Sequence, residues 1–144
     1  MSDLSLHDLS KKMAKLDFAM LNTAAAHGGL NSRPMSNNGD VEYDGDSYFF
    51  AYEQSRKISE IRADSKVSLT YTGAVGMLGG PPLFVCVEGS ASLIEDRSEF
   101  EDHWTKDLDH YFPDGMDTPG VVMIKVQAKT IRYWDGGDEG QISL

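Results

Sequence analysis

The stretch "KVSLTYTGAVGMLGGPPLFVCVEGSASLI", residues 66–94, decides the fold. Apolar and polar residues alternate over 66–72, which is the pattern of a strand with one buried face. A loop rich in glycine and proline follows at 73–82, and a longer apolar run covers 83–94. Gly89 interrupts this run and predicts a bulge or a close approach of another backbone. The stretch therefore predicts two strands of an antiparallel sheet.

The same signals recur on both sides of this pair of strands. Further strands are expected at 18–26, 30–36, 47–52, 121–128 and 130–134. Helices are expected at 5–16, where Ser5 and Asp8 form a capping box, from Ser55 to about Ala63, and from Asp96 past Trp104 to Leu108. Short strands with turn signals and a few short helices predict a mainly β chain of the α+β class, folded as a small barrel.

The length and composition of the chain narrow its class. Its 144 residues suit one domain, 1–144, with a real core. The net charge of −10 argues against nucleic-acid binding, because phosphates would be repelled. No apolar run approaches the roughly 20 residues of a membrane helix, and the single cysteine, Cys86, fits a reducing compartment. We therefore expect a cytoplasmic protein that binds neither nucleic acid nor membrane.

Two cations, Arg56 and Lys57, follow Ser55 in the first turn of an expected helix. The helix dipole is positive there, so each cation is unfavourable by about 0.3–1 kcal/mol. A bound anion would offset this effect, because free N–H groups, a serine hydroxyl and two cations form a phosphate cradle. The alternative is a solvated helix start whose long side chains lie in water. This stretch alone leaves both interpretations open.

A further cation interrupts an apolar run in "SRPM", residues 32–35. Pro34 restricts the strand to an edge or an interruption, which leaves backbone groups free for a ligand. We expect this strand beside the strand 47–52 that leads into the Ser55 helix, so that Arg33 converges on the same anion site. The alternative is a core arginine paired with Asp40, Glu42 or Asp44.

Flat apolar side chains accompany these cations. Met35 offers a soft apolar surface, and Phe49, Phe50 and Tyr52 supply aromatic area nearby. An anion site beside such a surface indicates a nucleotide-like cofactor, although the aromatic residues would also serve as ordinary core. The four histidines lack metal-ligand spacing, so we expect no metal site. The segment after Trp134, "DGGDEGQISL", is expected to be a solvated acidic end.

The order of these motifs resembles the flavin-binding split β-barrels related to pyridoxamine-phosphate oxidase, and within them the general stress protein group. The resemblance covers about residues 14–136. It rests on Ser-Arg-Pro-Met, a loop, Phe-Phe and Ser-Arg-Lys, followed by "FVCVEGSASLIED" (84–96), "HYFPDGMDTPGVVMIKV" (110–126) and "IRYWDGG" (131–137).

This resemblance implies an FMN-binding split barrel that forms a homodimer with flavin mononucleotide (FMN) at the interface. By position, the phosphate and ribityl contacts would come from Arg33, Ser55, Arg56 and Lys57. Residues along the cofactor would be Pro34, Met35, Phe50, Ala51 and Tyr52, and the partner subunit would bring Trp134 to the flavin. Many relatives have threonine at the position of Ala51, so one hydroxyl contact is lost here.

The resemblance also implies an FMN-dependent oxidoreductase linked to the stress response, with a nicotinamide as the possible electron donor and no assigned catalytic residue. Pyridoxamine-phosphate oxidases continue past the tryptophan with an Arg-x-His substrate segment, which this chain lacks. This difference argues against oxidation of pyridoxamine phosphate. The alternative function is a non-catalytic module that binds or senses flavin. Deazaflavin and haem are the other cofactors that split barrels hold.

Overall fold

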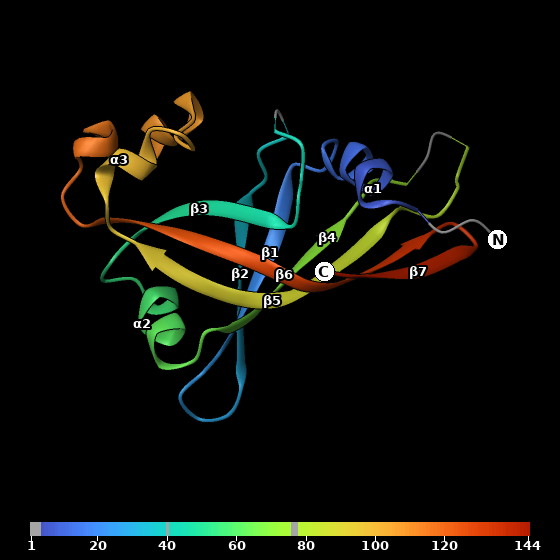
Figure 1. The fold of residues 1–144 in the computed structure, drawn as a ribbon, viewed down its shortest axis with the longest axis horizontal. Coiled ribbons are helices and arrows are strands. Elements are labelled where there is room, and N and C mark those ends of the chain that lie inside the picture. Colours follow the sequence, from blue (N-terminus) through green and yellow to red (C-terminus); the bar gives the residue numbers. More distant parts are fainter. Residues whose placement is uncertain (1–3, 40, 76–77) are drawn as a thin grey trace.

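A computed structural model of the chain describes residues 4–39, 41–75 and 78–144 (Figure 1). Its strands form one antiparallel sheet in the order β2-β1-β4-β5-β6-β3, with β7 paired to β6. The strands are β1 (Phe18–Ala24), β2 (Leu30–Ser36), β3 (Asp46–Tyr52), β4 (Lys66–Thr72), β5 (Phe84–Ile94), β6 (Val121–Asp135) and β7 (Asp138–Ser143). The mainly β split barrel expected from the sequence is confirmed.

Short helices surround this sheet. They are α1 (Leu6–Met13), α2 (Arg56–Ala63) and α3 (Arg97–Phe100), with the 3₁₀ turns η1 (Lys106–His110) and η2 (Gly115–Asp117). Figure 1 shows α1 and α3 toward opposite ends of the sheet. None of the helices in the described ranges has the length and apolar character needed to cross a membrane.

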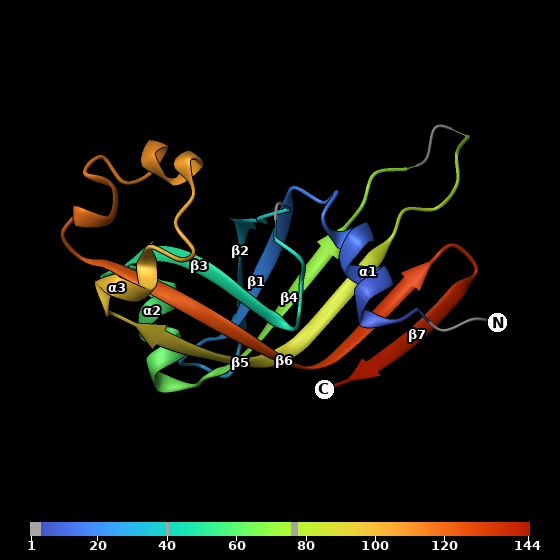
Figure 2. The same ribbon diagram turned by 45° about the horizontal axis from the view of Figure 1, so that its top comes forward.

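The strand β6 organises the sheet, because β5 lies along one side of it and two strands share the other. β3 pairs with residues 121–127 of β6, and β7 pairs with residues 130–135 (Figure 2). The two strands expected at 121–128 and 130–134 are therefore one strand of 15 residues. Opposite, the β5 register shifts at Gly89, where an added Cβ would lie 2.0 Å from the Gln127 carbonyl oxygen. The predicted bulge is confirmed.

The acidic segment after Trp134 is solvated, as the sequence predicts, but it also forms a strand, β7, that the sequence analysis did not predict. Gly136, with a φ of 67°, turns the chain, and β7 then pairs back along β6 from Asp135 to Thr130. Because β7 lies at an edge and alternates between exposed and half-buried residues, its acidic side chains stay in water while its backbone pairs.

The helix expected from Asp96 past Trp104 is wrong beyond its first turn. The α-helix ends at Phe100, and Trp104 lies in an irregular segment. Its indole Nε1 donates to Asp109 at 3.0 Å, and its ring packs against Phe50 with centroids 4.7 Å apart. Phe50, Phe100 and Trp104 belong to a small hydrophobic cluster, separate from the main core under the sheet. Contacts of the Trp104 ring with residues outside the expected helix, rather than helical spacing, therefore determine the position of this segment.

The expected pairing of β2 with β3 is also wrong. β2 pairs with β1, β3 pairs with β6, and the two strands are the opposite ends of the hydrogen-bonded order. Pro34 lies on β2, which is an edge strand, as the sequence predicts. In the described ranges, both end strands leave one backbone edge without a strand partner, and these edges mark the split of the barrel.

Candidate functional site

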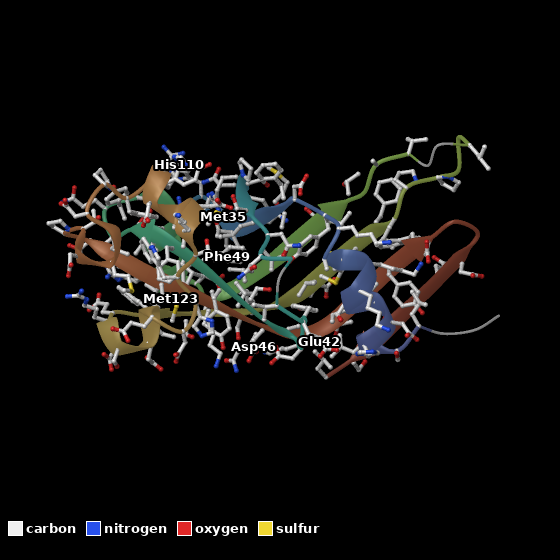
Figure 3. The ribbon with its side chains drawn as sticks, turned by 90° about the horizontal axis from the view of Figure 1, so that it is seen from above. Met35, Glu42, Asp46, Phe49, His110 and Met123 are labelled. Atoms are coloured by element: carbon white, nitrogen blue, oxygen red, sulfur yellow. The ribbon has the colours of Figure 1, made fainter. Side chains whose placement is uncertain are left out.

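A groove of about 920 Å³ lies where the barrel is split, and we call it the β2–β3 groove. Its walls come from the C-terminal half of α1, from β2 and the following loop, from β3, from the start of α2 and from the segment around η1. Figure 3 labels Met35, Phe49 and His110, three of the residues that line it, and shows them in the same part of the molecule. The groove is large enough for a cofactor-sized ligand.

The first turn of α2 opens onto this groove without the usual cap. Ser55 is the N-cap residue, but its side chain accepts no hydrogen bond from the helix. Its Oγ instead donates to the Tyr52 carbonyl at 2.7 Å. Within the described residues, no acceptor meets the backbone N–H of Arg56 or of Lys57, and the first turn holds no acidic side chain. The helix therefore presents free donors and uncompensated dipole charge to an anion.

Lys57 adds a full positive charge at this place. Its side chain is half-buried and lines the groove beside Ser55. No carboxylate forms an ion pair with it in the part of the chain that the structure describes. Burial, followed by the nearby charge of Arg33, lowers the pKa of the Lys57 ammonium below its ordinary value. A bound anion would reverse both effects, because it would supply the missing countercharge.

Arg33 does converge on α2, but it is not free. Its Nη2 lies 3.1 Å from Glu60 Oε1, while its Nη1 donates to Thr23 Oγ1 at 2.7 Å and to the Leu21 carbonyl at 3.2 Å. Arg33 is therefore ion-paired in this structure, as in the alternative interpretation of "SRPM", and its contact with a cofactor stays a prediction. Its partner is also not among the carboxylates considered from the sequence, of which Asp40 lies outside the described residues.

The groove brings together most of the cofactor residues suggested by the resemblance. Seven of them line it: Pro34, Met35, Phe50, Ala51, Tyr52, Ser55 and Lys57. Arg56 is exposed, and neither Arg56 nor Arg33 is among the residues that line the groove. Phe50 and Ala51 are buried, so the free edge of β3 offers a ligand mainly backbone donors and acceptors there. The groove therefore has a positive charge, that of Lys57, at the end where α2 begins.

Trp134 lies apart from the groove. It is on β6, opposite Phe84 of β5 and Glu139 of β7, and 40% of its surface is exposed. Phe84 in turn pairs with Thr72 of β4, and the β1–β4 register places Phe18 next in the same row. Phe18 and Phe84 are 60% and 41% exposed, so an aromatic row crosses the outer face of the sheet. An exposed apolar row of this kind is typical of an interface.

Sequence reasoning missed the polar residues that hold Arg33. Glu60 accepts from Thr23 Oγ1 at 2.8 Å and from Asn31 Nδ2 at 2.5 Å, in addition to Arg33. Burial raises the pKa of Glu60, but the two hydrogen bonds and the arginine outweigh it and lower the pKa below its ordinary value. Helical spacing relates Glu60 to Lys57, three residues earlier on the same helix face, and gave no signal for its pairing with Arg33, which lies on another element.

Comparisons with known proteins agree with this fold. No curated protein matches the chain. Among solved structures, general stress protein 26 from Bacillus anthracis str. Sterne has a TM-score of 0.72 at 24% identity, over 94% of this chain and 98% of the other. A general stress FMN/FAD binding protein from Xanthomonas citri has a TM-score of 0.73 at 16% identity, over 96% and 94%. A heme binding protein from Mycobacterium smegmatis has a TM-score of 0.75 at 12% identity, over 99% of this chain and 60% of the other.

These likenesses show a shared fold and leave the ligand open, because the solved structures include both flavin-binding and heme-binding proteins. The family assignment comes from the sequence itself. The model of the pyridoxamine 5'-phosphate oxidase like family matches residues 5–143, which is nearly the whole chain. The chain therefore belongs to the pyridoxamine 5'-phosphate oxidase like family.

Proposed function

We propose that this protein binds FMN in the β2–β3 groove, with the phosphate at the first turn of α2. The observation that carries this proposal is Lys57, a half-buried ammonium without a carboxylate partner in the described residues, placed over an uncapped helix start. A phosphate would accept from the free N–H groups and from Lys57, and Ser55 could add its hydroxyl. Arg56 would add long-range attraction from its exposed position.

The rest of the groove suits the remainder of the cofactor. Met35 and Pro34 on β2 offer apolar contact to a flat ring, and the open edge of β3 at Phe50 and Ala51 offers backbone hydrogen bonds. When bound, a flavin supplies hydride or electron transfer, so the protein needs to supply position and electrostatics only. The activity that we propose is therefore that of an FMN-dependent oxidoreductase. A non-catalytic flavin-binding module is the alternative.

We further propose that two copies form a homodimer. Trp134, which the resemblance places at the cofactor, does not line the groove of its own chain. It can reach a flavin only if a second copy brings it there, and the exposed row of Phe18, Phe84 and Trp134 gives such a copy an apolar surface. Sedimentation with FMN bound should therefore give a dimer at micromolar concentration. A monomer under these conditions would rule this assembly out.

Haem is the second candidate for the groove, because His103 and His110 both lie in its lining and imidazole is a common iron ligand. The deciding experiment compares absorption spectra of the purified protein mixed with FMN, deazaflavin or hemin and then freed of unbound ligand. We expect a bound flavin spectrum with FMN only. A stable haem spectrum without flavin retention would replace this proposal.

Catalysis is tested separately on the FMN-loaded protein. Steady-state consumption of a nicotinamide donor, followed by its absorbance in the presence of an electron acceptor, distinguishes an oxidoreductase from a storage or sensing module. We expect turnover that depends on FMN. Tight flavin binding with no turnover would favour the non-catalytic module.

A further inference from the structure

A buried carboxylate, Glu60, lies behind the proposed phosphate site. It is on α2, and its side chain is only 9% exposed. Three donors meet it: Thr23 Oγ1 at 2.8 Å, Asn31 Nδ2 at 2.5 Å and Arg33 Nη2 at 3.1 Å. A carboxylate with this many donors stays ionised in the fold, so its negative charge is a permanent feature of the site.

Arg33 is held in place by the same set of contacts. Its Nη1 donates to Thr23 Oγ1, and that hydroxyl donates in turn to Glu60. The guanidinium is therefore joined to the carboxylate both directly and through Thr23. A bond to the Leu21 carbonyl adds a further anchor. Together these contacts give two of the arginine's nitrogens partners within the protein.

Lys57, Glu60 and Arg33 form a group with two cations and one anion. Lys57 and Glu60 are three residues apart on α2, so their side chains emerge on the same face of the helix. Arg33 lies near enough to Lys57 for its charge to lower the pKa of the Lys57 ammonium, after the larger effect of burial. Within the described residues, Glu60 forms its ion pair with Arg33 and leaves Lys57 without one. Within the described residues, Lys57 and the exposed Arg56 are therefore the cations without an ion pair at the start of α2.

We propose that Glu60 is a specificity-determining residue of the flavin site: by neutralising Arg33 it limits how strongly the groove prefers a phosphorylated flavin over an uncharged one. The inference rests on the proposed function and adds to it. Riboflavin and FMN share the ring and the ribityl chain and differ in the phosphate. Their affinity ratio therefore reports the charge at the α2 end and cancels general damage to the fold.

The test measures dissociation constants of riboflavin and FMN by flavin fluorescence for the wild type and for Glu60→Gln. Glutamine keeps the size of the side chain and an acceptor for Thr23, but removes the charge. We expect the preference for FMN to rise at least about tenfold, which corresponds to about 1.4 kcal/mol. The matched control is Glu95→Gln, because Glu95 pairs with Arg62 of the same helix at the surface. In this control variant, the ratio of the riboflavin and FMN dissociation constants should not change.

An unchanged or reduced preference in a folded Glu60→Gln variant would overturn this proposal while leaving FMN binding itself intact. Absence of flavin binding by the wild type would instead overturn the proposed function. If Glu60→Gln does not fold, the double variant Arg33→Gln with Glu60→Gln carries the test. Since it removes both charges of the pair, its FMN preference should equal that of the wild type. A tenfold loss of preference would show that Arg33 serves the phosphate and would reject the proposal.

Discussion

The helices α1 and α2 are each eight residues long and each follows a serine, yet their first turns are built in opposite ways. In α1, Ser5 Oγ accepts from the Asp8 N–H at 3.1 Å, Asp8 supplies a negative charge, and lysines occupy the last turn. In α2, the serine makes no cap, the first turn has no acid, and two cations stand where acids are favoured. The charges of α1 complement its dipole and those at the start of α2 oppose it.

This difference separates a helix start that is capped by its own side chain from one that leaves its first-turn N–H groups for a ligand. The start of α1 lies outside the groove lining and has a side-chain cap from Ser5 and an acid, Asp8. The start of α2 faces the groove and has free donors and a half-buried ammonium, that of Lys57. A helix start that is poor for folding and faces a cavity is what an anion site requires. Residues of α1 therefore serve as internal controls for the first predictions that follow.

The largest expected effect is on binding at α2. Lys57→Ala should weaken FMN binding by one to two orders of magnitude, which corresponds to the ~1.5–3 kcal/mol of one charged hydrogen bond. Riboflavin affinity should stay the same. Lys11→Ala, which removes a lysine from the last turn of α1, should change neither. Fluorescence titrations of both flavins measure this, and equal losses for Lys57→Ala and Lys11→Ala would mean that net charge alone is responsible.

The next prediction compares the contributions of Ser5 and Ser55 to the free energy of unfolding. Ser5→Ala should lower the free energy of unfolding by about 1 kcal/mol, because a working N-cap bond is lost. Ser55→Ala should cost about 0.5 kcal/mol or less without ligand, since its side chain caps nothing. Urea unfolding of both variants checks this. With saturating FMN the stabilisation by ligand should shrink for Ser55→Ala only. Equal costs without ligand would contradict the uncapped description of α2.

A smaller effect follows from reversing one charge at α2. Arg56→Glu places an acid in the first turn, so the unliganded protein should gain about 0.3–1 kcal/mol in unfolding free energy. FMN binding should weaken, because phosphate and carboxylate repel. Lys11→Glu in the last turn of α1 should do the opposite to stability and leave binding unchanged. A variant Arg56→Glu that is less stable and binds FMN normally would show that the helix start is an ordinary solvated one.

The last prediction concerns pH and the acid that α2 does carry, Glu60. Burial raises its pKa, but hydrogen bonds from Thr23 and Asn31 and the charge of Arg33 lower it overall below the ordinary value of 4.5. A carboxyl with a lowered pKa stabilises the fold above its ordinary pKa, and this contribution is lost as the pH falls through the folded value.

The stability gap between wild type and Glu60→Gln should therefore be full at neutral pH and shrink once the pH falls below about 4.5. Urea unfolding at several pH values measures the gap. The exposed variant Glu95→Gln serves as control. A gap that stays constant down to acid pH would mean that the ion pair with Arg33 contributes little.

Local sequence signals predicted the strands well. The alternation over 66–72 and the run 30–36 predicted β4 and β2 with their observed bounds, and Gly89 marked the place where the register between β5 and β6 shifts. The α1 capping box was equally visible, although the helix ends at Met13 rather than at 16. In each of these cases the pattern that forms the element lies within the element, so no distant contact is needed to recognise it.

Elements that depend on distant partners were missed. β7 is an acidic edge strand that pairs with β6, and the Gly-Gly pair at 136–137 was a local sign of the turn between them. The Asp96 helix failed because Trp104 packs against Phe50. For the site, α2 and the groove residues were predicted, but the partner of Arg33 was not. Which carboxylate meets an arginine depends on the sheet order, which local sequence does not encode.

The most direct test of the central claim is the affinity of the wild-type protein for FMN compared with riboflavin, measured by fluorescence titration at fixed ionic strength. The claim is that the uncapped start of α2, with Lys57 beside it, binds the phosphate of a flavin. We expect FMN to bind at least about tenfold more tightly, as one charged hydrogen bond of ~1.5–3 kcal/mol requires. Equal affinity for the two flavins would contradict the claim.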